Sequence, residues 1–198
     1  LDISDRSIKV VWLTRGQGGF ELASWAYQDI PEGLIEGGEV KDAEKVASYV
    51  REAVLHVKGK RIKTPYVAVS LPEEKSFLSV IQMPYVGEKE LKSAIMLEAE
   101  NYIPFPLEEV ALDFQVIRQV IRDSQEHLDV LIAALPRMTV EGFAEVVKKS
   151  GFIPVFLAPE SIAIARSLVK EGVSTEPIFL LDFGSSRATI IAFSGYSI

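Results

Sequence analysis

The amino-acid sequence predicts a mixed α/β fold, and three observations support this prediction. One pattern occurs twice, in residues 1–12 (LDISDRSIKVVW) and residues 181–192 (LDFGSSRATIIA), where an acidic residue and a small-residue turn separate two short apolar strands. A helix-period segment leads into a short apolar run at residues 66–71, which is typical of a strand–helix–strand crossover. Between Pro72 and Pro136 the sequence follows a compact β-α-β-β pattern.

The two copies of the repeated pattern pair Asp2 with Asp182 and Ser4 with Gly184. Their polar turns leave backbone N–H groups free to face an anion, and a carboxylate at a strand end can hold Mg²⁺ directly or through its water shell. Asp, Gly and Ser are also the ordinary residues of β-turns. The alternative is therefore two unrelated hairpins with similar turns.

A pair of such hairpins resembles the phosphate-binding loops of the actin-like ATPase superfamily, which has a ribonuclease H-like fold. In that superfamily a Lys follows the first Asp by seven positions, and Lys9 stands at this spacing from Asp2. The resemblance implies that ATP is bound and that Asp2 and Asp182 hold Mg²⁺ through water. The implied cofactor-binding residues are Asp2, Ser4, Asp5, Ser7, Lys9, Asp182, Gly184, Ser185 and Ser186.

Composition excludes several classes of protein. The chain has 198 residues, 48% of them hydrophobic, which suffices for a packed core. It has no cysteine, which excludes disulfides and thiolate chemistry and favours a reducing cytoplasm. A net charge of −7 without a clustered basic face argues against a nucleic-acid partner. We find neither a signal peptide nor an apolar run long enough to span a membrane.

The first half of the chain continues the opening hairpin into a meander. Residues 20–27 are expected to form its third strand, and residues 34–40 a glycine-containing loop. Asp42 is expected to cap a helix that runs to about Lys58, because apolar residues recur there at helical spacing. Residues 66–71 then form a fully buried strand.

Between Pro72 and Pro136 we expect strands at residues 77–83, 111–122 and 128–135 and a helix at residues 88–102. The helix should cover the small sheet, because its apolar residues share one face. These residues are Leu91, Ala94, Ile95, Ala99 and Tyr102.

The main fold resumes after Pro136. A helix beginning near Thr139 should bury Phe143, Val146 and Val147 and end at Gly151. A strand at residues 152–157, a helix at residues 162–169 and a strand at residues 178–181 follow.

The chain opens without Met inside a strand and stops inside another strand, so we expect a piece of a longer protein whose C-terminal half is absent. The predicted organisation is an actin-like subdomain in two parts, residues 1–71 and 137–177. Residues 72–136 form an inserted subdomain, and residues 178–198 begin a truncated second domain.

Four motifs resemble the family of the type IV pilus assembly protein PilM, a relative of the cell-division protein FtsA. They are LDISDRSIKVV, VAVSLP, EAENYIPFPLEEVALDFQV and DFGSSRATI, and the third is the most specific. The resemblance covers essentially the whole chain. It implies an actin-like fold whose inserted subdomain is placed as in FtsA, matching residues 72–136.

The resemblance further implies a cytoplasmic ATP-binding scaffold at the inner face of the inner membrane, in a complex with other pilus components. The implied partner is the N-terminal peptide of a PilN-like bitopic membrane protein, bound in a cleft between the first and inserted subdomains. ATPase activity of residues 1–198 is expected to be weak or absent. The alternatives within the same superfold are a small-molecule kinase and an FtsA-like cytoskeletal protein.

Two departures bear on hydrolysis. Ser4 stands where the family has Gly, which would narrow the approach of a phosphate to the backbone. Related ATPases often carry Glu-Pro before the second hairpin, whereas this chain has Pro159-Glu160. Ala158 would then take the place of the carboxylate, and Glu160 is either a functional acid or a helix-start residue favoured by the helix dipole.

Other candidate sites have weaker patterns. His56 and His127 lack partners at triad or metal-site spacing and are expected at the surface. An acidic cluster could mimic a metal site or form a solvated face; it comprises Glu98, Glu100, Glu108, Glu109 and Asp113. Phe105, between two prolines, is expected to plug the small sheet rather than form an exposed apolar wall for a partner.

Overall fold

A computed structural model describes residues 1–74, 76–122, 125–184 and 187–198. The chain divides into two compact units. Unit 1 is Leu1–Glu74 with Met138–Glu160, and unit 2 is Lys75–Arg137 with Ser161–Ile198. The grouping of residues 161–177 with the inserted segment differs from the predicted organisation, which placed them with the first subdomain.

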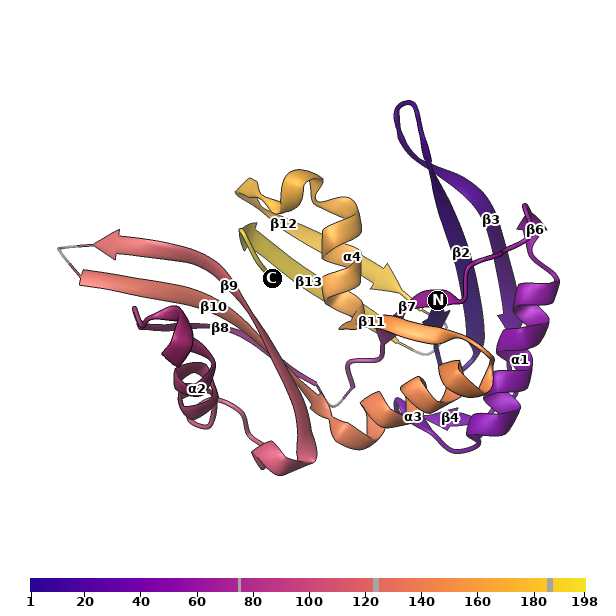
Figure 1. The fold of residues 1–198 in the computed structure, drawn as a ribbon, viewed down its shortest axis with the longest axis horizontal. Coiled ribbons are helices and arrows are strands. Elements are labelled where there is room, and N and C mark those ends of the chain that lie inside the picture. The colour runs from indigo at the N-terminus through magenta and orange to yellow at the C-terminus, as the bar shows by residue number, and fades with distance from the viewer. Residues whose placement is uncertain (75, 123–124, 185–186) are drawn as a thin grey trace. The chain divides into compact units, whose positions relative to one another are not determined.

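Unit 1 is built on a six-stranded sheet (Figure 1). Its strand order is β11 (Ile153–Pro159), β7 (Tyr66–Leu71), β1 (Asp2–Ile3), β2 (Ser7–Gly16), β3 (Gly19–Asp29) and β6 (Lys58–Gly59). Strands β1, β7 and β11 are parallel, and β1, β2 and β3 form the predicted antiparallel meander. The parallel neighbours come from a crossover connection, as the pattern at residues 42–71 predicted.

Two helices of unit 1 follow the predicted periodicity. In α1 (Ala43–Leu55) the buried residues are Val46, Ala47, Val50 and Ala53, and α1 packs on β2 and β3. In α3 (Arg137–Lys149) the residues Phe143, Val146 and Val147 are buried. The chain leaves α3 through Gly151, whose positive φ of 86° is the left-handed conformation of a helix C-cap. Both helix predictions are confirmed.

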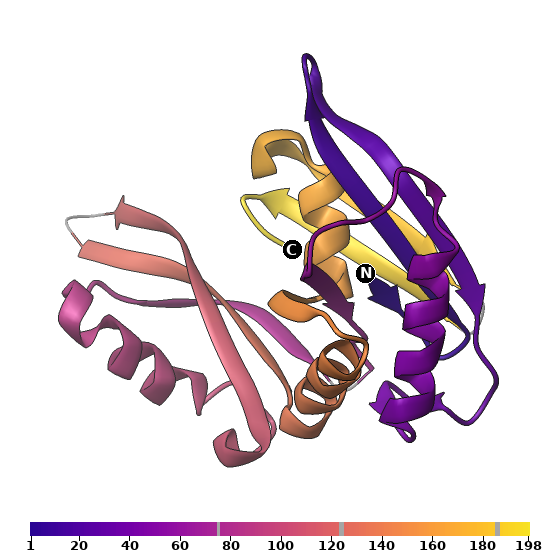
Figure 2. The same cartoon turned by 45° about the vertical axis from the view of Figure 1, so that its right-hand side comes forward.

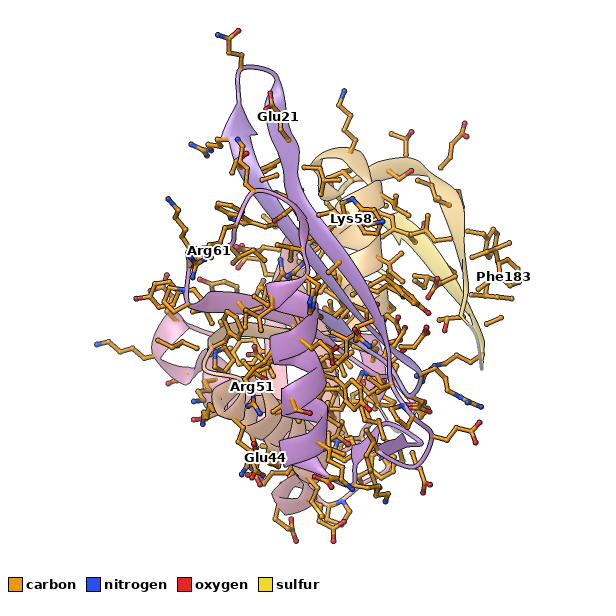
Figure 3. All side chains as sticks on the ribbon, turned by 90° about the vertical axis from the view of Figure 1, so that its right-hand side faces the viewer. Glu21, Glu44, Arg51, Lys58, Arg61 and Phe183 are labelled. Carbon is orange, nitrogen blue, oxygen red and sulfur yellow. The ribbon has the colours of Figure 1, made fainter. Side chains whose placement is uncertain are left out.

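Polar contacts fix the start of α1 and join it to α3. The Asp42 carboxylate accepts the Lys45 N–H at 3.0 Å, and this bond lowers the pKa of Asp42. Glu44 pairs with Arg51 and Lys149, which lower the pKa of its carboxyl. Figure 3 labels Glu44 and Arg51 on α1.

The inserted segment of unit 2 has the predicted β-α-β-β order. It contains β8 (Phe77–Pro84), α2 (Glu88–Ala99), β9 (Val110–Arg122) and β10 (Gln125–Pro136), with the antiparallel sheet order β8-β10-β9. Helix α2 covers one face of this sheet (Figure 2). The core between them includes Ile81, Ile95, Ala99, Val130 and Ile132.

The rest of unit 2 is a hairpin with one helix against it. Strands β12 (Ser174–Phe183) and β13 (Ala188–Gly195) pair antiparallel. Helix α4 (Glu160–Leu168) contributes Ala165 to a small core with Val169 and Phe193. The predicted strand at residues 178–181 is therefore the middle of a longer strand.

Three local predictions were wrong. Tyr102 is 43% exposed, because α2 ends at Ala99 and the helical period stops with it. Tyr66 is 58% exposed, so β7 is not buried along its whole length. The segment expected to be a loop holds two short paired strands, β4 (Ile35–Glu36) and β5 (Glu39–Val40).

Candidate functional site

The candidate phosphate site of unit 1 lies at the carboxyl edge of the parallel strands. In the sheet register Asp2 of β1 pairs with Ser70 of β7, and Ser70 pairs with Ala158 of β11. The three residues therefore form one row across the sheet, each one position before its strand ends. In open α/β sheets, ligands bind just outside the carboxyl ends of the strands.

The Asp2 carboxylate is held from two sides. Lys9 Nζ lies 2.9 Å from Asp2 Oδ2, and Ser70 Oγ donates to Asp2 Oδ1 at 3.0 Å. Asp2 and Lys9 are cross-strand partners in the first hairpin, so their seven-residue spacing is a consequence of the hairpin register. The hairpin register therefore places the Asp2 carboxylate beside the Lys9 ammonium group at this edge of the sheet.

The turn of the first hairpin is closed by hydrogen bonds of its own residues. The Ser4 N–H donates to the Ser7 carbonyl at 2.9 Å, and the Ser7 N–H donates to Ser4 Oγ at 3.2 Å. The prediction that all the turn's amides face an anion is therefore wrong for Ser4 and Ser7. The amides of Asp5 and Arg6 enter no hydrogen bond within the described part of the chain, and they remain available as donors.

The second hairpin, in unit 2, repeats the geometry of the first. Asp182 pairs with Thr189 across β12 and β13, as Asp2 pairs with Lys9. The Gly184 N–H donates to the Arg187 carbonyl at 2.8 Å and closes the turn, as the Ser4 N–H does in the first copy. Gly184 therefore does not offer its amide to an anion.

The predicted phosphate-loop residues Ser185 and Ser186 lie outside the described residues. The other predicted residues are divided between the units. Asp2, Ser4, Asp5, Ser7 and Lys9 belong to unit 1, and Asp182 and Gly184 belong to unit 2.

The unit 1 residues fit a magnesium–phosphate group by the chemistry of their donor set. Asp2 is 32% exposed at its side chain, and each carboxylate oxygen accepts one hydrogen bond and retains a second lone pair. Because these bonds already fix both oxygens, water-mediated contact with Mg²⁺ suits Asp2 better than direct ligation. Lys9 supplies a cation for a phosphate oxygen.

Ser70 was not predicted as part of this site. The available signal was its place as a small hydroxyl residue near the end of the apolar strand VAVSLP, parallel to the strand that carries Asp2. Ala158 is buried in the same row and offers no carboxylate there. Glu160 is the first residue of α4, where either interpretation of its role still applies.

The two histidines differ in exposure, and neither they nor the acidic residues form a candidate metal site. His56 is exposed as predicted, whereas His127 is only 25% exposed at its side chain and lies 3.7 Å from Asp129. His127 is therefore partly covered rather than fully exposed. Within the described ranges no three His, Cys, Asp or Glu side chains form a group that could hold a metal ion.

The segment after α2 buries Ile103 and leaves Phe105 partly exposed. Phe105 is 40% exposed, while its neighbour Ile103 is 6% exposed and belongs to the core under α2. Ile103 therefore plugs the small sheet, and the prediction of that role for Phe105 was wrong.

Across the described residues we find no helix of the length and apolarity that a membrane crossing requires.

Comparison with known proteins identifies the fold. A solved structure described as a PilM-PilN type IV pilus biogenesis complex is 28% identical, with a TM-score of 0.82 over 99% of this chain and 57% of that chain. The chain thus spans little more than half the length of that relative, and over this span the predicted actin-like fold class is confirmed.

A second structure is the cytoplasmic domain of EpsL, an inner membrane component of the type II secretion system of Vibrio cholerae. It is 14% identical, with a TM-score of 0.49 over 96% of this chain and 68% of that chain.

The family model described as type IV pilus assembly protein PilM matches residues 1–192. The chain therefore belongs to the PilM family of type IV pilus assembly proteins.

Proposed function

We propose that this protein is a cytoplasmic ATP-binding scaffold of type IV pilus assembly that binds the N-terminal peptide of a PilN-like membrane protein. Through that partner it would sit at the inner face of the inner membrane with other pilus components. The observation that carries the proposal is the similarity to the PilM-PilN complex, which extends over 99% of this chain at a TM-score of 0.82.

The nucleotide part of the proposal rests on the carboxyl edge of the unit 1 sheet. Bound Mg-ATP would supply a phosphate chain with its charge partly neutralised by the metal. Asp2 would hold the metal's water shell, Lys9 would contact a phosphate oxygen, and the Asp5 and Arg6 amides would donate to the same group.

The peptide part rests on the inserted segment of unit 2. In the order β8-β10-β9, strands β8 and β9 each have one edge that pairs with no other described strand of that sheet. An extended peptide can pair its backbone with such an edge and insert alternate side chains into apolar pockets. Phe105, 40% exposed and separated from β9 by the short 3-10 helix Leu107–Glu109, would offer an apolar wall for one of these side chains.

The peptide proposal is tested by calorimetric titration of a PilN-like N-terminal peptide into residues 1–198. We expect saturable binding without nucleotide, and Phe105→Ala should weaken it about tenfold, since an apolar contact of this kind is worth one to two kcal/mol. Ile121→Ala is the matched control. Ile121 is an exposed apolar residue of the same sheet, 69% exposed, but it lies at the end of β9 that is distant in sequence from Phe105. Equal effects of both substitutions would contradict the role of Phe105.

The nucleotide proposal is tested on a longer chain that includes the rest of the second domain. We expect Mg-dependent ATP binding there, lost on Asp2→Asn or Lys9→Met, and weak or no binding by residues 1–198. Glu21→Gln is the control, because Glu21 is an exposed carboxylate of β3 that pairs with Thr14 near the β2–β3 turn, at the opposite end of the meander from Asp2. Unchanged affinity after Asp2→Asn would refute the site, and ATP-dependent phosphorylation of a small metabolite would indicate a kinase instead.

A further inference from the structure

A short basic segment lies between α1 and β7, where it includes the edge strand β6 of the unit 1 sheet. Residues 58–63 read KGKRIK and contribute four positive charges, whereas the chain as a whole has a net charge of −7. From Ala53 to Pro72 no residue is acidic. The prediction that the basic residues form no cluster was therefore wrong for this segment. We call its four cations the basic edge; they are Lys58, Lys60, Arg61 and Lys63, and Figure 3 labels the first and the third.

The backbone of the segment is fixed against β3. Lys58 and Gly59 pair with Trp25 and Ser24, and the Lys60 N–H donates to the Ala23 carbonyl at 2.9 Å. Lys58 Nζ also lies 4.6 Å from the centre of the Trp25 ring, which is the geometry of a cation–π contact. The first cations of the basic edge are therefore carried by an ordered backbone.

The charges of the basic edge are not neutralised within the described part of the chain. All four side chains are exposed, and none of them forms an ion pair there. By contrast Lys41, Lys45 and Lys149, in the same unit, each pair with a carboxylate. Clustered charges of one sign raise the local potential and attract counter-charges, so the basic edge is available to an anionic partner.

The side chains at the basic edge favour a layer of lipid headgroups over an acidic peptide. Three of the four cations are Lys, a point charge on a flexible stem, whereas bidentate recognition of a carboxylate favours Arg. Apolar groups lie beside the charges: Leu55, the last residue of α1, is 79% exposed, and Trp25 under Lys58 is 41% exposed. Clustered Lys and Arg bind anionic headgroups, and Trp is enriched at the membrane–water interface.

We propose that the basic edge contacts an anionic phospholipid surface directly. Each Lys or Arg held near such a surface raises the partition coefficient about fivefold, so the four cations act together. The acidic remainder of the chain is repelled by the same surface, which leaves the basic edge as the point of contact. The inference does not depend on the proposed binding of nucleotide or peptide, although two membrane signals, one direct and one through a PilN-like partner, would reinforce each other.

Co-sedimentation of residues 1–198 with lipid vesicles tests the proposal, without peptide or nucleotide. The vesicles contain phosphatidylcholine alone or with about 30% phosphatidylglycerol, an anionic lipid. We expect binding to the anionic vesicles only. The partition coefficient should fall about tenfold as salt rises from about 50 to about 300 mM, because salt screens exposed charges.

Two matched double substitutions locate the contact. Lys60→Gln with Lys63→Gln should lower the partition coefficient about twentyfold, since two of the four cations are lost. Lys89→Gln with Lys92→Gln on α2 is the control, because these lysines are also exposed and three positions apart, and their loss changes the net charge equally. The control should change the partition coefficient less than about twofold.

Three outcomes would overturn the proposal. The first is equal partition into neutral and anionic vesicles, and the second is an equal effect of the two double substitutions. The third is binding of polyglutamate, lost on Lys60→Gln with Lys63→Gln, by a chain that does not bind anionic vesicles, which would assign the basic edge to an acidic protein segment. Calorimetric titration of the PilN-like peptide into the same variant should be unchanged, so failure of the membrane contact is distinguishable from failure of the proposed function.

Discussion

Replacing Arg118 by Met should destabilise unit 2 mainly through the carboxylate that it leaves behind. Asp129 is 4% exposed in the central strand β10, where Arg118 Nε of β9 lies 2.6 Å from its Oδ2 and Gln82 Nε2 of β8 donates to its Oδ1 at 3.0 Å. Arg118 itself is 51% exposed at its side chain and also stacks on Tyr196 at 5.7 Å.

This difference in burial makes the two single substitutions unequal. Removing one partner of a buried ion pair lowers the free energy of unfolding by about 3–5 kcal/mol. For Arg118→Met we expect a loss of about 2–3 kcal/mol, because Gln82 still donates to Asp129. Asp129→Leu should cost only about 1 kcal/mol, since the Arg118 guanidinium returns to water and only the Gln82 amide loses a bond. The double variant should be about as stable as Asp129→Leu.

Urea and thermal unfolding, both followed by circular dichroism, measure the stability of the two single variants and of the double variant. Both tryptophans, Trp12 and Trp25, belong to unit 1, so tryptophan fluorescence reports that unit separately. Arg118→Met should lower Tm by about 5–10 °C, at about 2–4 °C per kcal/mol for a chain of this size. A larger loss for Asp129→Leu than for Arg118→Met, or strictly additive losses in the double variant, would refute the reasoning.

Three further predictions concern unit 1. Phe143→Ala should cost about 3–5 kcal/mol in urea unfolding because Phe143 is fully buried, whereas Met138→Ala on the same helix, 81% exposed, should change stability by less than about 0.5 kcal/mol. Gly59→Ala should lower the free energy of unfolding by at least about 2 kcal/mol, because φ is +106° at this position and the new Cβ would clash with the Ala23 carbonyl oxygen. An unchanged Tm would contradict this prediction. Glu44→Gln should lower Tm at neutral pH but not in strongly acidic solution. The lowered pKa of Glu44 means that its ion pairs stabilise the fold above the ordinary value of 4.5 and are lost as pH falls through the lowered pKa, and a pH-independent Tm difference would exclude this cause.

Local pattern was sufficient for most elements. The period of α3 identified Phe143, Val146 and Val147 as its buried face, and the repeated hairpin pattern identified two turns that close with the same register. The seven-residue spacing of Asp2 and Lys9 is also a local feature, because both residues lie within one short hairpin whose register brings their side chains into contact. Such features depend on residues a few positions apart, where the period of a helix or a strand fixes which side chains are neighbours.

The tertiary structure alone decided the features that join distant segments. Ser70 reaches Asp2 across 68 positions, and the burial of Asp129 depends on strands from either side of β10. Ile103, and not Phe105 as predicted, is buried against the small sheet, because exposure depends on where the chain leaves α2. The sequence determined the elements and the hairpin register, since these follow from local periodicity. Which polar groups are paired, and which strand edges remain open, depends on pairing between segments far apart in the chain, and a single sequence does not specify that register.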